Sequence, residues 1–313
     1  MLTLSLSHFL SSSLAPSPPP AAPNPKPTPI TQSLTEIKAL LASRGLRPRH
    51  ALGQNFLHDG NHLRAIVEAA GVGPGDRVLE VGPGTGTLTG ALLDAGTRVV
   101  ACELDAGLAG LVRERFGSRE DFELIEGDCL DGKHGLNPEM MDRLRGEAGA
   151  FPPFKLVANL PYQAASPLLA NLAGLPGRPM TAAVVMLQKE VADRLTAGPG
   201  SKAYGALGVL LQAGHAVDRV AVLPASCFWP QPKVQSAVAR LVRLDEPLVD
   251  DLPAFGRFLH TLFAKRRKQL GAVLGRGFPF PEGVDPNGRA EDLPPEALAG
   301  LFKLRVVRKP DHV

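Results

Sequence analysis

Three alternate glycines, Gly82, Gly84 and Gly86, lie between a strand-like segment and a helix-like segment. Glycine lets the backbone pass close to a ligand where a Cβ would collide, and the amides of the following helix can then face a polar group. The G-x-G-x-G spacing differs from the G-x-G-x-x-G of dinucleotide-binding loops. The pattern favours a ligand site over a plain strand–helix turn.

Two acids follow the next two β-rich segments. Glu103 ends the second segment, where a carboxylate can accept hydrogen bonds from both ribose hydroxyls of an adenosine-containing ligand. Asp128 follows the third and can accept a hydrogen bond from the amine of the ligand's adenine, although a lone aspartate is more often a turn residue. NAD and S-adenosylmethionine both contain adenosine, and either ligand would fit a site made of the glycine loop and Glu103.

The tetrapeptide Asn159-Leu160-Pro161-Tyr162 follows the fourth β-rich segment. An amide oxygen and the next backbone carbonyl can together accept both hydrogens of one –NH2 group, such as the exocyclic amine of adenine. Proline stiffens the turn, and tyrosine offers a face for stacking. Alone, the motif also fits a proline turn with a buried tyrosine; after the three preceding motifs it indicates recognition of an adenine amine.

An aromatic loop and two basic groups indicate a nucleic-acid partner. Phe228 and Trp229 precede Pro230, Pro232 and Lys233, so flat side chains lie beside a positive charge on a stiff loop. The basic groups that could contact phosphate are Arg44, Arg47 and Arg49 and the run Lys265-Arg266-Arg267-Lys268. A packed proline-rich loop and a solvated helix face are the structural alternatives.

The composition is that of an ordinary globular protein. Of 313 residues, 44% are hydrophobic and 21% charged, which excludes a fibrous or wholly disordered chain. The net charge is only +3, so a nucleic-acid site requires locally concentrated positive charge. No apolar run is long enough to span a membrane. Three scattered cysteines without a C-x-x-C pair favour a cytoplasmic protein and predict no metal site.

Alternating strand and helix patterns predict a mostly parallel twisted sheet covered by helices, an α/β fold. We expect a capping box at Ser33–Glu36 and a Gly/Pro-rich insertion at 131–153. We expect residues 1–32 to form a disordered Pro/Ser-rich tail. We expect residues 33–244 to form the α/β domain and residues 245–313 a small helical domain. The expected strands are 77–81, 97–102, 122–126, 154–158, 182–187, 216–223 and 236–242, and the expected helices are 62–70, 88–95, 106–116, 252–274 and 294–302.

In this order, the motifs resemble the ribosomal RNA adenine dimethyltransferase family, most closely its bacterial small-subunit members. The resemblance covers about residues 34–275. It rests on Gly53–Leu57, Gly82–Gly86, Glu103, Gly127-Asp128, Asn159–Tyr162, Gln188–Glu190, Phe228–Ser236 and Phe263–Lys268.

The resemblance implies a Rossmann-like class I methyltransferase domain and a helical RNA-binding domain. Members transfer methyl groups from S-adenosylmethionine to two adjacent adenosines near the 3′ end of 16S rRNA, giving N6,N6-dimethyladenosine, with a role in small-subunit biogenesis. The implied protein is a cytoplasmic monomer that acts on 16S rRNA within a small-subunit precursor.

The site residues implied by the resemblance fall into three groups. Those expected to bind the methyl donor are Asn55, Leu57, Gly82, Gly84, Glu103, Asp128 and Asn159. Those expected to act in catalysis are Asn159, Leu160, Pro161, Tyr162 and Phe228, with the rings of Tyr162 and Phe228 sandwiching the base. Those expected to bind RNA are Arg47, Arg49, Lys233, Lys265, Arg266, Arg267 and Lys268.

Three alternatives stay open on the sequence. A 23S rRNA adenine methyltransferase of the macrolide-resistance type shares the catalytic motifs. A non-catalytic RNA-binding assembly factor shares the fold, although the intact Asn159–Tyr162 motif argues against it. A nicotinamide oxidoreductase is disfavoured by the glycine spacing.

Overall fold

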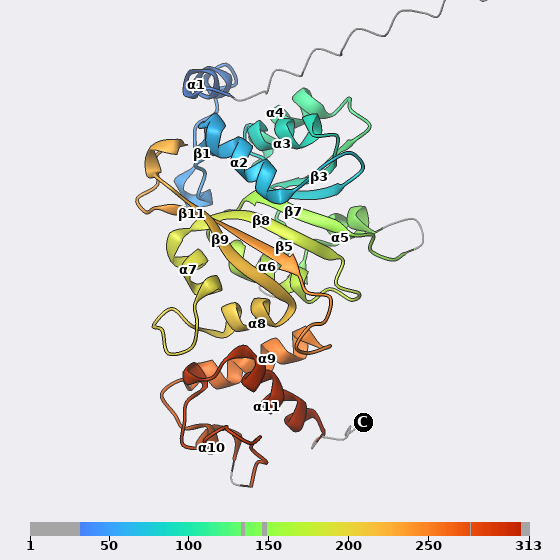
Figure 1. Ribbon diagram of the computed structural model, residues 1–313. Coiled ribbons are helices and arrows are strands. Elements are labelled where there is room, and N and C mark those ends of the chain that lie inside the picture. Colours follow the sequence, from blue (N-terminus) through green and yellow to red (C-terminus); the bar gives the residue numbers. More distant parts are fainter. Residues whose placement is uncertain (1–31, 133–134, 146–148, 276, 308–313) are drawn as a thin grey trace, which may run out of the picture.

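A seven-stranded sheet forms the centre of the computed structural model, which describes residues 32–132, 135–145, 149–275 and 277–307 (Figure 1). The strand order is β4-β3-β2-β7-β8-β11-β9; the first five strands are parallel, and β11 is antiparallel to both neighbours. The strands are β2 (Arg77–Val81), β3 (Arg98–Glu103), β4 (Phe122–Glu126), β7 (Phe154–Asn159), β8 (Met180–Gln188), β9 (His215–Leu223) and β11 (Ser236–Arg243). All seven predicted strands are present, with ends that differ by at most two residues.

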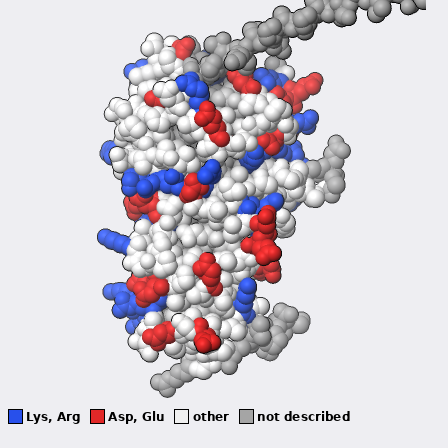
Figure 2. All heavy atoms as spheres, in the orientation of Figure 1, with Lys and Arg blue, Asp and Glu red and all other residues white. Residues whose placement is uncertain are grey.

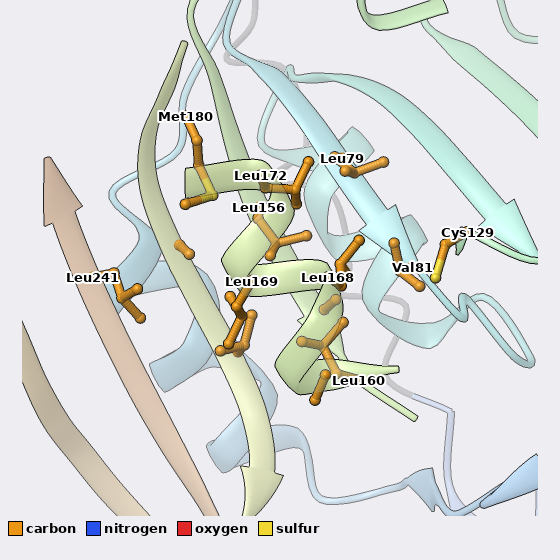
Figure 3. Packing of buried hydrophobic residues seen from close by; sticks show 14 of the residues in the cluster. Leu79, Val81, Cys129, Leu156, Leu160, Leu168, Leu169, Leu172, Met180 and Leu241 are labelled. Atoms are coloured by element: carbon orange, nitrogen blue, oxygen red, sulfur yellow. The ribbon is translucent and has the colours of Figure 1, made fainter. Parts of the chain in front are cut away.

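Successive residues of the central strands point into two separate hydrophobic clusters, one on each face of the sheet. Val78 belongs to the cluster that also contains buried residues of four helices: α1 (Leu34–Ala42), α2 (Gly60–Ala70), α3 (Thr87–Asp94) and α4 (Ala106–Phe116). Leu79 belongs to the opposite cluster, with α5 (Pro138–Leu144), α6 (Ala165–Ala173) and α7 (Lys189–Thr196). Figure 3 shows Leu168, Leu169 and Leu172 of α6 against β2 and β7 in this second cluster.

The predicted insertion at 131–153 contains regular structure. After the hairpin β5 (Leu130–Asp131) and β6 (Gly135–Leu136), Asn137 caps α5 by accepting a hydrogen bond from the backbone N–H of Met140. Met140, Met141 and Leu144 are buried in the core. The glycines and prolines around this segment therefore flank a packed helix rather than form a loop throughout.

A third cluster joins the C-terminal helices to α8 (Ala206–Gly214). It contains Phe255 and Phe258 of α9 (Leu252–Ala264), Leu270 of α10 (Leu270–Leu274) and Phe302 of α11 (Pro295–Val307). The predicted helix 252–274 is thus two helices, interrupted after Ala264. In Figure 1 this group lies at the end of the molecule opposite α1. The predicted domain division at residue 244 stays a proposal, since this cluster includes residues from both sides of it.

The predicted disordered tail lies outside the described residues except for Gln32. That side chain is buried, and its Oε1 accepts a hydrogen bond from the Thr87 hydroxyl at 2.6 Å. The expected capping box is present, because Ser33 and Glu36 each accept from the other's backbone N–H. None of the helices in the described ranges combines the length and apolar character needed to cross a membrane.

Candidate active site

The glycine loop between β2 and α3 depends on backbone conformations that glycine favours. Gly82, Gly84 and Gly86 have φ angles of 71°, 61° and 77°. A Cβ on Gly84 would lie 3.1 Å from the ring of Phe56, and one on Gly86 would lie 2.6 Å from the ring of Phe116. Both the left-handed backbone and the close packing therefore require glycine in this loop.

The carboxylate of Glu103 lies beside the glycine loop at the end of β3. The backbone N–H of Gly84 donates to Oε2 at 3.0 Å, and that of Asp105 donates to Oε1 at 2.9 Å. Glu103 is only 5% exposed. Burial raises the pKa of Glu103, while the two backbone donors oppose that effect. The two hydrogen bonds thus hold the carboxylate in place at the carboxyl ends of β2 and β3, where it can accept hydrogen bonds from a ligand.

The Asn159–Tyr162 turn meets the glycine loop because β2 and β7 are parallel neighbours. The ring of Pro161 packs on Gly82, with ring carbons 3.6 Å from the position a Cβ would take. The side-chain NH2 of Asn159 donates to the backbone carbonyl of Asn55 at 2.9 Å. Since its nitrogen is engaged in this way, the amide oxygen is the atom that Asn159 offers to a ligand amine.

One cavity of about 400 Å³ lies over these carboxyl ends, at the point where the strand order reverses between β2 and β7. Its walls come mainly from residues 50–57, 80–85, 102–104, 127–130, 159 and 161–164. All seven residues predicted to bind the methyl donor line it, as do Pro161 and Tyr162. Its volume suits a small-molecule ligand.

Asp128 lies at the rim of the cavity and is exposed. Its Oδ1 accepts a hydrogen bond from the backbone N–H of Leu130 at 3.0 Å. Asp128 is therefore a turn residue, as the sequence alternative had it. The second carboxylate oxygen is the one that Asp128 offers to a ligand.

Several residues of the cavity wall were not singled out from the sequence, Leu104 and Glu80 among them. Leu104 is 51% exposed beside Glu103 and offers an apolar face to the cavity. Glu80 is 1% exposed and accepts a hydrogen bond from the Thr89 hydroxyl at 2.7 Å. An acid in the middle of an apolar strand was the available signal for Glu80.

We expect Glu80 to make stability depend on pH. Burial raises the pKa of Glu80 to about 8, the Thr89 hydrogen bond opposes this, and the charge of Glu103 adds to it. Because the folded state disfavours the ionised acid, the contribution of Glu80 to stability should be fully present below the unfolded pKa of about 4.5 and be lost as pH rises towards 8. Glu80→Gln stays neutral, so its unfolding free energy relative to wild type should rise by a few kcal/mol over this window, at about 1.4 kcal/mol per pKa unit.

Urea unfolding of both proteins from pH 5 to pH 9, without ligand, measures this difference. A wild-type and a Glu80→Gln curve that stay parallel over the whole range would contradict the assignment.

Hydrogen bonds and an ion pair connect Arg49 and Gln54, in the segment before β1 (Phe56–Leu57), to Asp105 at the start of α4. Oδ1 of the buried Asp105 accepts from the first backbone amides of α4, and its Oδ2 faces Arg49 Nη1 at 3.2 Å and Gln54 Nε2 at 3.3 Å. The backbone N–H of Arg49 in turn donates to Gln54 Oε1 at 2.7 Å. Arg49 therefore has an acidic partner, whereas Arg47 is exposed and its side chain forms no ion pair or hydrogen bond with any residue that the structure describes.

The other predicted RNA-binding residues lie on separate parts of the surface. Lys233 is exposed in the loop before β11, and Lys265, Arg267 and Lys268 are exposed after α9. Arg266 instead forms an ion pair with Glu291. Figure 2 shows lysine and arginine side chains in separate clusters on the face drawn, with acidic side chains between them.

The predicted sandwich of Tyr162 and Phe228 is not formed in this structure. Tyr162 lines the cavity, but Phe228 is 2% exposed and packs in the core cluster behind it. The reason is the pairing of β10 (Phe228–Trp229) with β1 (Phe56–Leu57), which places Phe228 opposite Leu57. Trp229 instead stacks on Phe56, with ring centroids 6.4 Å apart. Leu160 is also buried outside the cavity wall.

Comparisons with known proteins agree with this geometry. Residues 45–304 match the model of the family described as ribosomal RNA adenine dimethylase. The ribosomal RNA small subunit methyltransferase A of Opitutus terrae is 43% identical over 79% of this chain and 84% of its own length. The protein of the same name from Rhodococcus opacus is 42% identical over 85% of this chain and 92% of its own.

Solved structures show the same fold. The 23S rRNA methyltransferase ErmE has a TM-score of 0.61 and 27% identity, covering 80% of this chain and 99% of its own. A dimethyladenosine transferase from Plasmodium falciparum has a TM-score of 0.64 and 24% identity, covering 81% and 98%.

Proposed function

The chain belongs to the ribosomal RNA adenine dimethylase family, and from this membership we propose that it dimethylates two adjacent adenosines near the 3′ end of 16S rRNA. It is an S-adenosylmethionine-dependent ribosomal RNA adenine methyltransferase. The substrate we propose is a precursor of the small ribosomal subunit in the cytoplasm, bound by a single copy of the chain. The contact between the Asn159–Tyr162 turn and the glycine loop carries the proposal, because it brings an amine-binding motif to a nucleoside-sized cavity.

The residues of the cavity fit S-adenosylmethionine. Left-handed glycines leave room for close backbone approach, Glu103 provides a buried carboxylate for ribose hydroxyls, and Leu104 provides an exposed apolar face for adenine. Asn55, Leu57 and Asp128 complete the proposed donor site, with Asn159 at its border. Bound there, S-adenosylmethionine supplies a methyl group on a positively charged sulfur, which an amine nitrogen can attack.

The acceptor side of the reaction rests on Asn159 and its neighbours. The Asn159 amide oxygen accepts a hydrogen of the adenine amine, which concentrates the nitrogen lone pair for attack. Leu160, whose carbonyl is the second acceptor that the family motif implies, lies outside the cavity wall in this structure. Tyr162, on the cavity wall, provides a stacking face for the extruded base. These contacts act by positioning and electrostatics, so no dedicated general base is required.

Mass spectrometry of 16S rRNA from cells lacking the protein tests the proposal. The expected result is loss of N6,N6-dimethyladenosine near the 3′ end, restored by the wild-type gene and not by an Asn159→Ala variant. Intact dimethyladenosine in the deletion strain would overturn the proposed substrate.

A 23S rRNA activity is the second candidate, supported by the structural likeness to ErmE. The identity of 42–43% to proteins named for the small subunit, against 27% to ErmE, favours 16S rRNA. Primer extension on both RNAs after incubation with the purified protein separates the two.

We expect Lys265, Arg267 and Lys268 to contribute phosphate contacts. Replacing all three with alanine should weaken RNA binding and lower the slope of log affinity against log salt by about 2–3, at 0.7–0.9 per contact. Filter binding of 16S rRNA across a salt series measures the slope, and donor affinity should not change.

Arg266→Ala is the matched control for this cluster. Because Arg266 is paired with Glu291, its replacement should lower the free energy of unfolding. The slope of log affinity against log salt should stay close to that of wild type. An unchanged slope in the triple variant would identify the cluster as a solvated helix end only.

A further inference from the structure

Three metal-ligating side chains of different types meet outside the donor cavity. Asp59 and His62 flank the start of α2, and Cys227 ends the short 3-10 helix η2 (Ala225–Cys227) just before β10. The β1–β10 pairing brings the two segments together, and the backbone N–H of His58 donates to the carbonyl of Cys227 at 3.0 Å. None of the three side chains lines the cavity described above.

The spacing of the ligand atoms suits one shared cation. His62 Nδ1 lies 3.5 Å from Cys227 Sγ and 3.0 Å from Asp59 Oδ1, and Sγ lies 3.9 Å from Asp59 Oδ2. Bond lengths of about 2.0–2.3 Å around tetrahedral zinc place neighbouring ligand atoms about 3.3–3.6 Å apart. The Nδ1–Sγ distance lies in this range, and the Sγ–Oδ2 distance exceeds it by about 0.3 Å. The same imidazole nitrogen faces both the thiol and the carboxylate, as it would if all three pointed at a common centre.

The cluster is partly exposed, so a cation can reach it from solvent. Cys227 is 4% exposed, whereas the side chains of Asp59 and His62 are about one-third exposed. Asp59 Oδ1 already caps α2 by accepting from the backbone amides of Asn61 and His62. Oδ2 is therefore available to a cation without loss of the cap.

We propose that Asp59, His62 and Cys227 form a three-ligand site for a zinc-type divalent cation, with the fourth position open to water. A thiolate, an imidazole and a carboxylate are a donor set that zinc accepts readily. Binding converts the Cys227 thiol to a thiolate, and the released proton passes to solvent.

Occupancy of this site would stiffen the loop that carries the aromatic residues. The cation would join the start of α2 to η2, and η2 immediately precedes Phe228 and Trp229 in the chain. Trp229 stacks on Phe56, which lines the donor cavity. The site is thus structural, and its effect on methylation is indirect.

Cobalt titration of the purified, chelator-treated full-length protein tests the proposal. Wild type should develop a thiolate-to-cobalt charge-transfer band that saturates at a single equivalent and is abolished by zinc. Cys227→Ser should lose the band, and His62→Gln and Asp59→Asn should weaken zinc affinity at least tenfold. Asp59→Asn retains a capping oxygen, so it separates metal binding from loss of the helix cap.

His260→Gln is the matched control, because His260 is an exposed histidine outside the cluster and its loss should leave the titration unchanged. Zinc should also raise the melting temperature of wild type and not that of Cys227→Ser. The proposal fails if wild type shows no charge-transfer band, or if the band survives in Cys227→Ser and so arises from Cys102 or Cys129.

Discussion

Replacing Asn159 with alanine should lower the single-turnover rate of methyl transfer about 10²–10³-fold, the usual loss when one electrostatic contact to the reacting group is removed. The NH2 group of Asn159 is held by the Asn55 carbonyl, so its oxygen has a fixed direction before substrate arrives. Alanine removes this acceptor and leaves the amine's lone pair delocalised into the ring. The rate is measured with RNA and S-adenosylmethionine both saturating, which separates it from any change in donor binding.

Two further variants make the Asn159 result specific. Asn159→Asp keeps an acceptor oxygen and should retain more activity than Asn159→Ala. Asn171→Ala, on α6 and away from the cavity wall, should leave the rate unchanged. A rate for Asn159→Ala within tenfold of wild type would remove Asn159 from the catalytic assignment.

The fold could be predicted largely because its strands carry local signals. Segments such as Arg77–Val81 and Phe122–Glu126 are rich in β-branched or aromatic residues and end at glycine or a polar turn, so their predicted bounds equal those observed. α5 was missed because the surrounding glycines and prolines outweighed the helical spacing of Met140, Met141 and Leu144. The interruption after Ala264 was missed because basic residues are themselves good helix formers.

The grouping of the cavity residues followed from topology rather than from side-chain detail. The glycine loop, Glu103, Asp128 and Asn159 each lie at the carboxyl end of a parallel strand, and these ends share one edge of the sheet. Glu103 and Asn159 could therefore be placed together without knowledge of their contacts. Glu80 could not, because its signal, an acid within an apolar strand, indicates a buried polar group but not whether that group faces the cavity.

Pairing between distant segments accounts for the buried position of Phe228 and for the Asp59–His62–Cys227 cluster outside the cavity. β1 and β10 contain two residues each, too few for a recognisable pattern, yet their pairing fixes Phe228 in the core and Cys227 beside His62. A base sandwich with Phe228 would require this short ladder to open. A stacking role for Tyr162 alone requires no such change.

Replacing Glu103 with alanine should weaken S-adenosylmethionine binding by about 1–3 kcal/mol, because two ribose hydroxyls lose their acceptor. Part of that loss arises through the glycine loop, since Glu103 also accepts from the backbone amide of Gly84. Isothermal titration calorimetry with S-adenosylmethionine measures the affinity. Glu103→Gln keeps one acceptor oxygen and should fall between wild type and the alanine variant.

Glu126→Ala is the matched control, because Glu126 stands in register with Glu103 at the end of the neighbouring strand β4. Its side chain pairs with Arg113 outside the cavity, so donor affinity should be that of wild type. Urea unfolding of Glu103→Ala then separates the two contributions: a folded variant with weaker donor binding supports the ribose contact. Unchanged affinity in Glu103→Ala would show that the carboxylate only braces the glycine loop, and the ribose would have to be held elsewhere in the cavity.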